Sequence, residues 1–203
     1  MVSETLKIAR RVLVEIAFLE MGLFVVCAYV IGSIPTGAWF AQWWCGMDIR
    51  QHGSGNIGAS NIARVLGKRF FVPIFLFDAG KAYAVLALGA LFLPLVYVPV
   101  FIYLAPAALL IGNGYSCFLN FRGGKGVATV VGIMLYVLPA FVGVFACAWL
   151  ALLVVSRKPF IASLGAMVLA TGVMTFWDVK HVPFLLCIIA WLVFAHRANL
   201  KKL

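Results

Sequence analysis

Residues 126–155 read GVATVVGIMLYVLPAFVGVFACAWLALLVV, a stretch without a single charged residue, and basic pairs lie on both sides of it, at 122–125 and 157–158. As one helix it would be about 43 Å long, which exceeds the roughly 30 Å hydrocarbon core of a bilayer. A single crossing would also separate the two basic pairs, although Lys and Arg favour the cytoplasmic side. We therefore predict two short helices, broken near Leu138-Pro139, that cross the membrane and return.

The composition of the whole chain supports a membrane protein. Of its 203 residues 65% are apolar and 11% are charged, against roughly 45–50% and 25% in ordinary soluble domains. This excludes a water-soluble globular domain. Keeping every basic cluster on the cytoplasmic side predicts an all-α integral membrane protein with about seven transmembrane helices, its N-terminus outside and its C-terminus cytoplasmic. The predicted spans are 22–44, 70–92, 95–112, 126–155 as two helices, 160–176 and 182–195.

Residues 1–20 differ from the rest, because Glu15 and Glu20 interrupt what would be the apolar core of a signal peptide. We interpret 1–20 as an N-terminal extension or amphipathic helix, followed by a single transmembrane domain at 21–203. The net charge of +10 comes from basic residues scattered between apolar spans, which is a poor pattern for nucleic acid and a better one for anionic lipids or small anionic substrates. No cysteine or histidine spacing suggests a metal site.

The first polar break, residues 53–64, reads GSGNIGASNIAR. It contains G-x-G-x-x-G, but the dinucleotide fingerprint requires a preceding strand, and here an apolar helix precedes. What remains is a glycine-dense turn whose Ser54, Asn56, Asn61 and Arg64 can offer donors to an anion. A flexible connector is the alternative.

The second break, residues 112–129, reads GNGYSCFLNFRGGKGVAT and continues directly into an apolar helix. It is not a Walker A motif, because Gly126 follows Lys125 where Ser or Thr is required. Glycines still allow close backbone approach, and a helix N-terminus favours phosphate. Anchoring by positive charge alone is the alternative for Arg122 and Lys125.

The third break, residues 196–203, reads HRANLKKL. His196 and Asn199 would share one face if the last helix continued; a topogenic tail is the alternative. Asp78 and Lys81 are also three residues apart, on the second span, and can form a structural pair or act as substrate ligands. The glycines and proline at 32–37 predict a kink in the first span.

The three breaks, in this order and spacing, resemble the signatures of the bacterial acyl-phosphate:glycerol-3-phosphate acyltransferases of the PlsY type, over residues 21–203. Departures include Ser60 where Thr is usual and Asn113 where His is common. The resemblance implies a seven-helix enzyme of the bacterial inner membrane whose active site faces the cytoplasm. It implies transfer of a fatty acyl group from acyl phosphate to the 1-hydroxyl of glycerol 3-phosphate, forming lysophosphatidic acid and inorganic phosphate. Implied partners are membrane lipids and, transiently, the soluble enzyme that makes acyl phosphate.

The resemblance also implies roles for single residues, with no cofactor and no metal. It implies catalytic roles for Ser54, Arg64, Lys125, His196 and Asn199. Substrate binding is implied for Asn56, Asn61, Arg122, Gly123, Gly124, Gly126, Thr129 and Arg197, with Asp78 and Lys81 in support. The proton acceptor is either His196 or a substrate phosphate. No histidine begins the H-x-x-x-x-D motif of acyltransferases that use thioesters, which favours acyl phosphate as donor. A transporter of phosphorylated metabolites is the alternative function.

Overall fold

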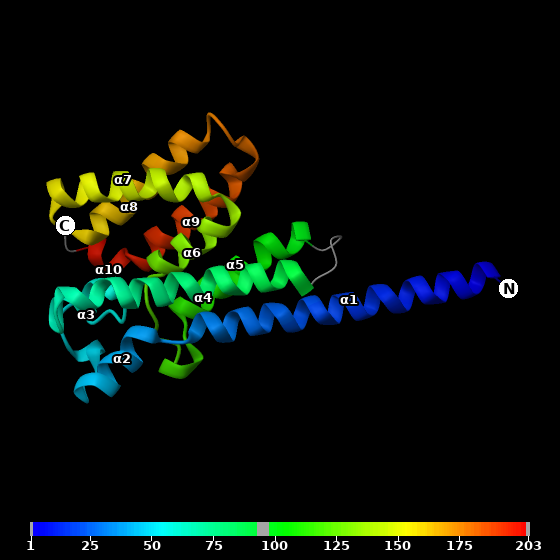
Figure 1. Ribbon diagram of the computed structural model, residues 1–203, viewed down its shortest axis with the longest axis horizontal. Coiled ribbons are helices and arrows are strands. Elements are labelled where there is room, and N and C mark those ends of the chain that lie inside the picture. The colour runs from blue at the N-terminus through cyan, green and yellow to red at the C-terminus, as the bar shows by residue number, and fades with distance from the viewer. Residues whose placement is uncertain (1, 93–97, 202–203) are drawn as a thin grey trace.

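A computed structural model describes residues 2–92 and 98–201. Within these ranges the regular structure is helical, with short 3-10 turns between the helices. Figure 1 shows α7, α8 and α9 gathered in one lobe, while the first half of α1 projects from the body. The α-helices are α1 Val2–Ser33, α2 Thr36–Cys45, α3 Ala59–Val65, α4 Phe71–Phe92, α5 Val98–Gly114, α6 Val127–Val137, α7 Pro139–Ser156, α8 Pro159–Met174, α9 Val182–Ala195 and α10 Arg197–Leu200.

The break predicted inside 126–155 is confirmed. α6 ends at Val137, Leu138 leaves the helical conformation with φ −150° and ψ 75°, and Pro139 begins α7. Proline has no backbone N–H, and its ring clashes with the preceding helical turn, so it is well placed only at a helix start. α6 has 11 residues and is therefore about 16 Å long, roughly half the thickness of the hydrocarbon core.

Four helical segments of the described chain are long and apolar enough to cross a bilayer, and three apolar helices are shorter. The long segments are Val14–Cys45, Lys68–Phe92, Phe101–Leu119 and Pro139–Ser156, and the short ones are Val127–Val137, Pro159–Met174 and Val179–Ala195. The predicted spans at 70–92, 160–176 and 182–195 agree with α4, α8 and α9 to within two residues. The predicted first span, 22–44, is in fact divided between α1 and α2.

The kink predicted at 32–37 is confirmed, and an ion pair holds it in place. α1 ends at Ser33 and α2 begins at Thr36. Lys81 of α4 donates from Nζ to Ile34 O at 2.6 Å and lies 2.7 Å from Asp78 Oδ1, which also accepts from Thr36 Oγ1 at 2.9 Å. Because buried charges are costly unless paired, this network fixes α4 to the break. Asp78 and Lys81 thus form the ion pair that their spacing allows, and their contact with substrate stays a prediction.

Glycines allow the helices to approach closely. A Cβ on Gly32 would lie 2.5 Å from Leu109 O, so α1 and α5 touch backbone to backbone. A Cβ on Gly132 of α6 would lie 2.0 Å from Ala79 O of α4. Two apolar clusters result. The larger cluster contains residues of α1 and of each helix from α4 to α9. The smaller cluster packs α2, α3 and the 46–58 loop against the start of α4, with Ile49 and Ile62 fully buried.

Candidate functional site

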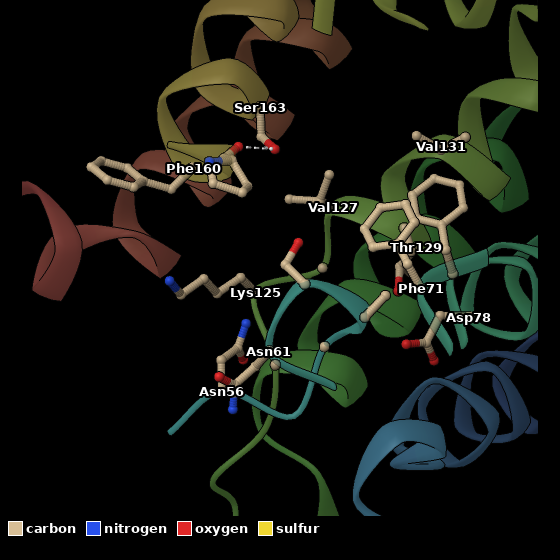
Figure 2. A pocket seen from close by; sticks show the side chains of 18 of the residues that line it. Asn56, Asn61, Phe71, Asp78, Lys125, Val127, Thr129, Val131, Phe160 and Ser163 are labelled. Carbon is tan, nitrogen blue, oxygen red and sulfur yellow. Dashed lines mark hydrogen bonds between the residues drawn. The ribbon is translucent and has the colours of Figure 1, made fainter. Parts of the chain in front are cut away.

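A cavity of about 390 Å³ brings all three polar breaks together. The first break contributes residues between Ser54 and Arg64, the second Asn113 and Gly124 to Thr129, and the third His196 and Asn199. Helices α4, α7 and α8 complete the wall. Figure 2 shows Lys125 and Asn61 on one side of the cavity and Phe71 and Val131 on the other. Segments far apart along the chain therefore form a single site.

Asn61 organises the first loop from within. Its Oδ1 accepts from the backbone N–H of Ser54 at 2.8 Å, and its Nδ2 donates to His52 O at 2.9 Å. Gly53 has φ +61°, and a Cβ there would lie 2.3 Å from Asn61 Oδ1. Asn61 lines the cavity, but its polar atoms are occupied by the loop, because a buried amide must be hydrogen-bonded. Asn61 thus holds the backbone of Ser54 in place, and its implied contact with substrate stays a prediction.

The second loop lies against the C-terminal end of α5. The N–H of Gly123 donates to Gly114 O at 2.9 Å, and that of Gly124 donates to Asn113 O at 2.7 Å. A Cβ on Gly123 would lie 2.0 Å from Asn113 O, so only glycine permits this approach. The N–H groups of Gly123 and Gly124 thus donate to the backbone of α5, and the phosphate contact implied for these glycines stays a prediction.

The start of α6 supplies amides that remain available. Gly126 caps the helix with φ +84°, and the first backbone bond runs from the N–H of Val130 to Gly126 O at 2.8 Å. Amides in the first turn of a helix have no acceptor within the helix. Val127 and Thr129, which belong to this turn, line the cavity, and Thr129 Oγ1 is buried without a partner among the described residues. This end of α6 therefore favours an anion.

Lys125 connects the second break to the third, because its Nζ donates to Asn199 Oδ1. Burial and, to a lesser extent, the positive charge of Arg64 together lower the pKa of Lys125 to about 8. Arg64 also lines the cavity. Two cations that face one cavity attract an anionic ligand, and its charge would favour the protonated lysine.

His196 lies between α9 and α10, so the last helix does not continue through it. His196 and Asn199 nevertheless both line the cavity. Nδ1 of His196 lies 2.8 Å from Leu192 O; since a carbonyl oxygen only accepts, Nδ1 carries the proton and Nε2 is left as an acceptor. Burial lowers the pKa of His196, and the charge of Lys125 acts in the same direction. The imidazole is therefore neutral at pH 7.

The structure leaves some of the expected residues outside the cavity. Ser54, Asn56 and Asp78 line it, whereas Arg122, Lys81 and Arg197 are not part of its wall. Arg197 donates from Nη1 to Phe194 O at 2.9 Å, and its guanidinium lies 4.2 Å from the centre of the Phe194 ring. Arg122 is exposed at the surface.

The apolar half of the cavity was not anticipated from the sequence. Ala146 and Leu150 both line the cavity and are exposed, so it opens sideways onto the apolar surface of α7. Asn113 was also missed; its Oδ1 is buried beside Gly124 without a partner among the described residues. Apolar residues that line a ligand site have the same sequence pattern as those that face lipid. The unanticipated apolar residues are Phe71, Phe75, Val131, Val142, Phe145, Trp149, Leu150 and Phe160.

A sequence model of the family described as "Glycerol-3-phosphate acyltransferase" matches residues 22–203. The chain belongs to this family. Proteins named glycerol-3-phosphate acyltransferase from Synechococcus sp. (strain JA-2-3B'a(2-13)) and Lawsonia intracellularis are 41% and 37% identical to it, each match covering 89% of this chain and 90% of the relative. The resemblance to the PlsY type is thereby confirmed.

Two crystal structures of PlsY, an integral membrane glycerol 3-phosphate acyltransferase, have the same fold. The glycerol 3-phosphate form superposes with a TM-score of 0.79 at 29% identity, and the lysophosphatidic acid form with 0.77 at 28%. Each match covers 90% of this chain and 91% of the other. The protein is therefore an acyltransferase and an integral membrane protein, and the transporter alternative is not favoured.

Proposed function

We propose that the protein transfers a fatty acyl group from acyl phosphate to the 1-hydroxyl of glycerol 3-phosphate, forming lysophosphatidic acid and inorganic phosphate. The observation that carries this proposal is the division of the cavity. Its polar half holds Arg64, Lys125 and the start of α6, and its apolar half opens beside α7. One cavity of this kind can receive two phosphates and one acyl chain at the same time.

The donor phosphate is assigned to Lys125, the first-turn amides of α6 and the hydroxyl of Thr129. The unpartnered, buried Thr129 Oγ1 supports this assignment, because a buried hydroxyl without a partner is costly until a ligand supplies one. The same donors can stabilise the oxyanion that forms on the acyl carbon. Gly123 and Gly124 contribute by bringing the loop against α5.

Glycerol 3-phosphate is assigned to Ser54, Asn56, Arg64, His196 and Asn199. The oxygen of its 1-hydroxyl attacks the acyl carbon and forms the ester bond. The bond between that carbon and the phosphate oxygen then breaks, and phosphate leaves with the electron pair. The proton passes to an oxygen of a substrate phosphate, and Nε2 of His196 is the alternative acceptor on the protein. Acyl phosphate is already activated, so positioning and charge stabilisation are sufficient.

The membrane arrangement proposed from the charges places the N-terminus outside and the cavity and C-terminus on the cytoplasmic side of the bacterial inner membrane. This arrangement has seven membrane crossings, because α6 and α7 are two crossings of unequal length: the chain leaves the cytoplasmic side through α6 and returns to it through α7. Residues 1–20 form an extension to a single domain at 21–203. Membrane lipids then surround the opening beside α7, and a cytoplasmic cavity is accessible to the soluble enzyme that makes acyl phosphate.

The test mixes purified protein with acyl phosphate and glycerol 3-phosphate, without ATP, CoA or divalent metal. We expect stoichiometric formation of inorganic phosphate and lysophosphatidic acid. Lys125→Met should reduce turnover by about 100-fold or more, as loss of a donor to the developing charge does elsewhere, while the protein remains folded in detergent. Turnover that requires CoA, or near-normal turnover of Lys125→Met, would reject the proposal.

A further inference from the structure

The cavity has one side where helices do not close it by direct packing. Within the described chain, α7 packs closely along α8 and over a shorter length along α6, and no comparable packing joins α7 to α4. Side chains bridge these two helices instead. Phe71 of α4 and Trp149 of α7 stack with ring centroids 6.1 Å apart and an interplanar angle of 22°. Both rings line the cavity.

Trp149 is held in this position from α8. Its Nε1 donates to Ser163 Oγ at 3.1 Å, and Ser163 Oγ donates to Pro159 O at 2.8 Å. Figure 2 shows the second of these bonds as a dashed line at Ser163. Ser163 is only 5% exposed, so a buried hydroxyl with a fixed orientation determines the orientation of the indole.

Phe71 is supported from the other side. It stacks with Phe75, one turn along α4, with centroids 5.7 Å apart and an interplanar angle of 15°. Beyond the Phe71–Trp149 stack the wall becomes surface, since Leu150 lines the cavity and is 59% exposed. Two supported rings therefore stand where the cavity meets the apolar exterior.

We infer that Trp149 determines acyl specificity: the Trp149–Phe71 stack, fixed by Ser163, sets the width of the passage through which the acyl chain leaves the cavity between α4 and α7. This inference rests on the proposed function. An unbranched chain passes such a boundary, whereas a methyl branch at the crossing carbon forces the rings apart, and displacing well-packed side chains is costly. The enzyme therefore selects its donor by the cross-section of the chain at one position.

The experiment uses acyl phosphates of equal length that carry one methyl branch, moved carbon by carbon along the chain. For the wild-type protein we expect kcat/KM to fall about tenfold or more at one branch position, the discrimination that a hydrophobic site achieves for one extra methyl group. Trp149→Ala should abolish this minimum. Ser163→Ala and Trp149→Phe, which keep a ring but lose the hydrogen bond, should each make it shallower.

Trp177→Ala is the matched control, because Trp177 is 75% exposed and lies outside the cavity. It should keep the wild-type profile. A wild-type profile without a minimum, or one that Trp149→Ala, Ser163→Ala and Trp149→Phe all leave unchanged, would overturn the inference. If Trp149→Ala does not fold, the other two variants decide. A wild-type protein that transfers no unbranched acyl group at all would instead reject the proposed function.

Discussion

Lys125 has a lowered pKa of about 8 because it is buried, and the charge of Arg64 contributes to this shift. In the free enzyme a rise in pH through that value removes the charge that we propose holds phosphate, so kcat/KM should fall on the alkaline side. Arg64→Gln removes a cation that disfavours protonated lysine. We expect this alkaline limb to move to higher pH, even though kcat/KM is lower throughout. A pH profile of kcat/KM measures the shift.

Arg197→Gln is the control for this profile, since Arg197 lies over Phe194 outside the cavity. It should leave the alkaline limb unchanged. An unchanged or acid-shifted limb in Arg64→Gln would contradict the coupling between Arg64 and Lys125.

His196 provides a second prediction at the level of single residues. Burial lowers its pKa, so it is a weaker base than an ordinary histidine, and a substrate phosphate is the other proposed acceptor. We expect His196→Gln to lower kcat by about tenfold or less and to keep the shape of the pH profile, because we propose that a substrate phosphate takes the proton. His181→Gln, outside the cavity, is the control. A loss of about 100-fold or more, together with loss of the acidic limb, would instead make His196 the base.

The sequence predicted which polar residues meet better than it predicted what each one does. Ser54, Lys125 and Asn199 lie at one cavity as expected, because polar breaks between apolar helices are kept out of contact with lipid. Asn61 and Arg197 could not be assigned in the same way. A polar side chain in a loop can face a ligand or its own backbone, and only tertiary packing decides between them.

Among the structural elements, the start of α6 depends on one glycine. Gly126 has φ +84°, a conformation that costs a residue with a Cβ roughly 1–2 kcal/mol. Gly126→Ala should therefore lower the thermal stability and also reduce turnover, because the cap aims the α6 amides at the cavity. Gly143→Ala on α7, where a new Cβ meets nothing within 4 Å, should retain both. Equal behaviour of the two variants in thermal unfolding and activity assays would contradict this role of the cap.

The network at the break between α1 and α2 gives a prediction about stability. Asp78→Asn leaves the buried ammonium of Lys81 without its counter-charge, which costs about 3–5 kcal/mol when a buried pair is broken in this way. Asp48→Asn breaks the more exposed pair with Arg50 and should cost about 1 kcal/mol or less. Unfolding of the two variants in detergent compares these costs. Similar losses would show that the Asp78 network is not what holds the break.

Helix positions were predictable where proline or charge marks an end. Pro139 and Pro159 begin α7 and α8, close to the expected boundaries. α1 runs unbroken from Val2 to Ser33, so the helix expected at 1–20 and the start of the first span form one element. The end of α1 at Ser33 was predictable from the glycines and proline at 32–37, whereas the contact of Asp78 and Lys81 with this break is a tertiary interaction.

For the whole molecule, the extension should be dispensable for catalysis. Among the described residues, those that line the cavity lie between Ser54 and Asn199, whereas the first half of α1 projects from the body (Figure 1). We expect a protein that begins at Met21 to keep kcat/KM within about twofold. It should lose some thermal stability, because Ala17 is buried and its apolar contacts disappear. A fall in kcat/KM well beyond twofold, measured at a temperature where both proteins are folded, would place the extension in the reaction.

The contact between Lys125 and Asn199 has a consequence for folding. The two residues are 74 positions apart in the sequence, and the helices α6, α7, α8 and α9 lie between them. A contact across so long a segment has to offset the entropy cost of closing that segment. The lysine–asparagine pair therefore completes the cavity wall only once these four helices have packed.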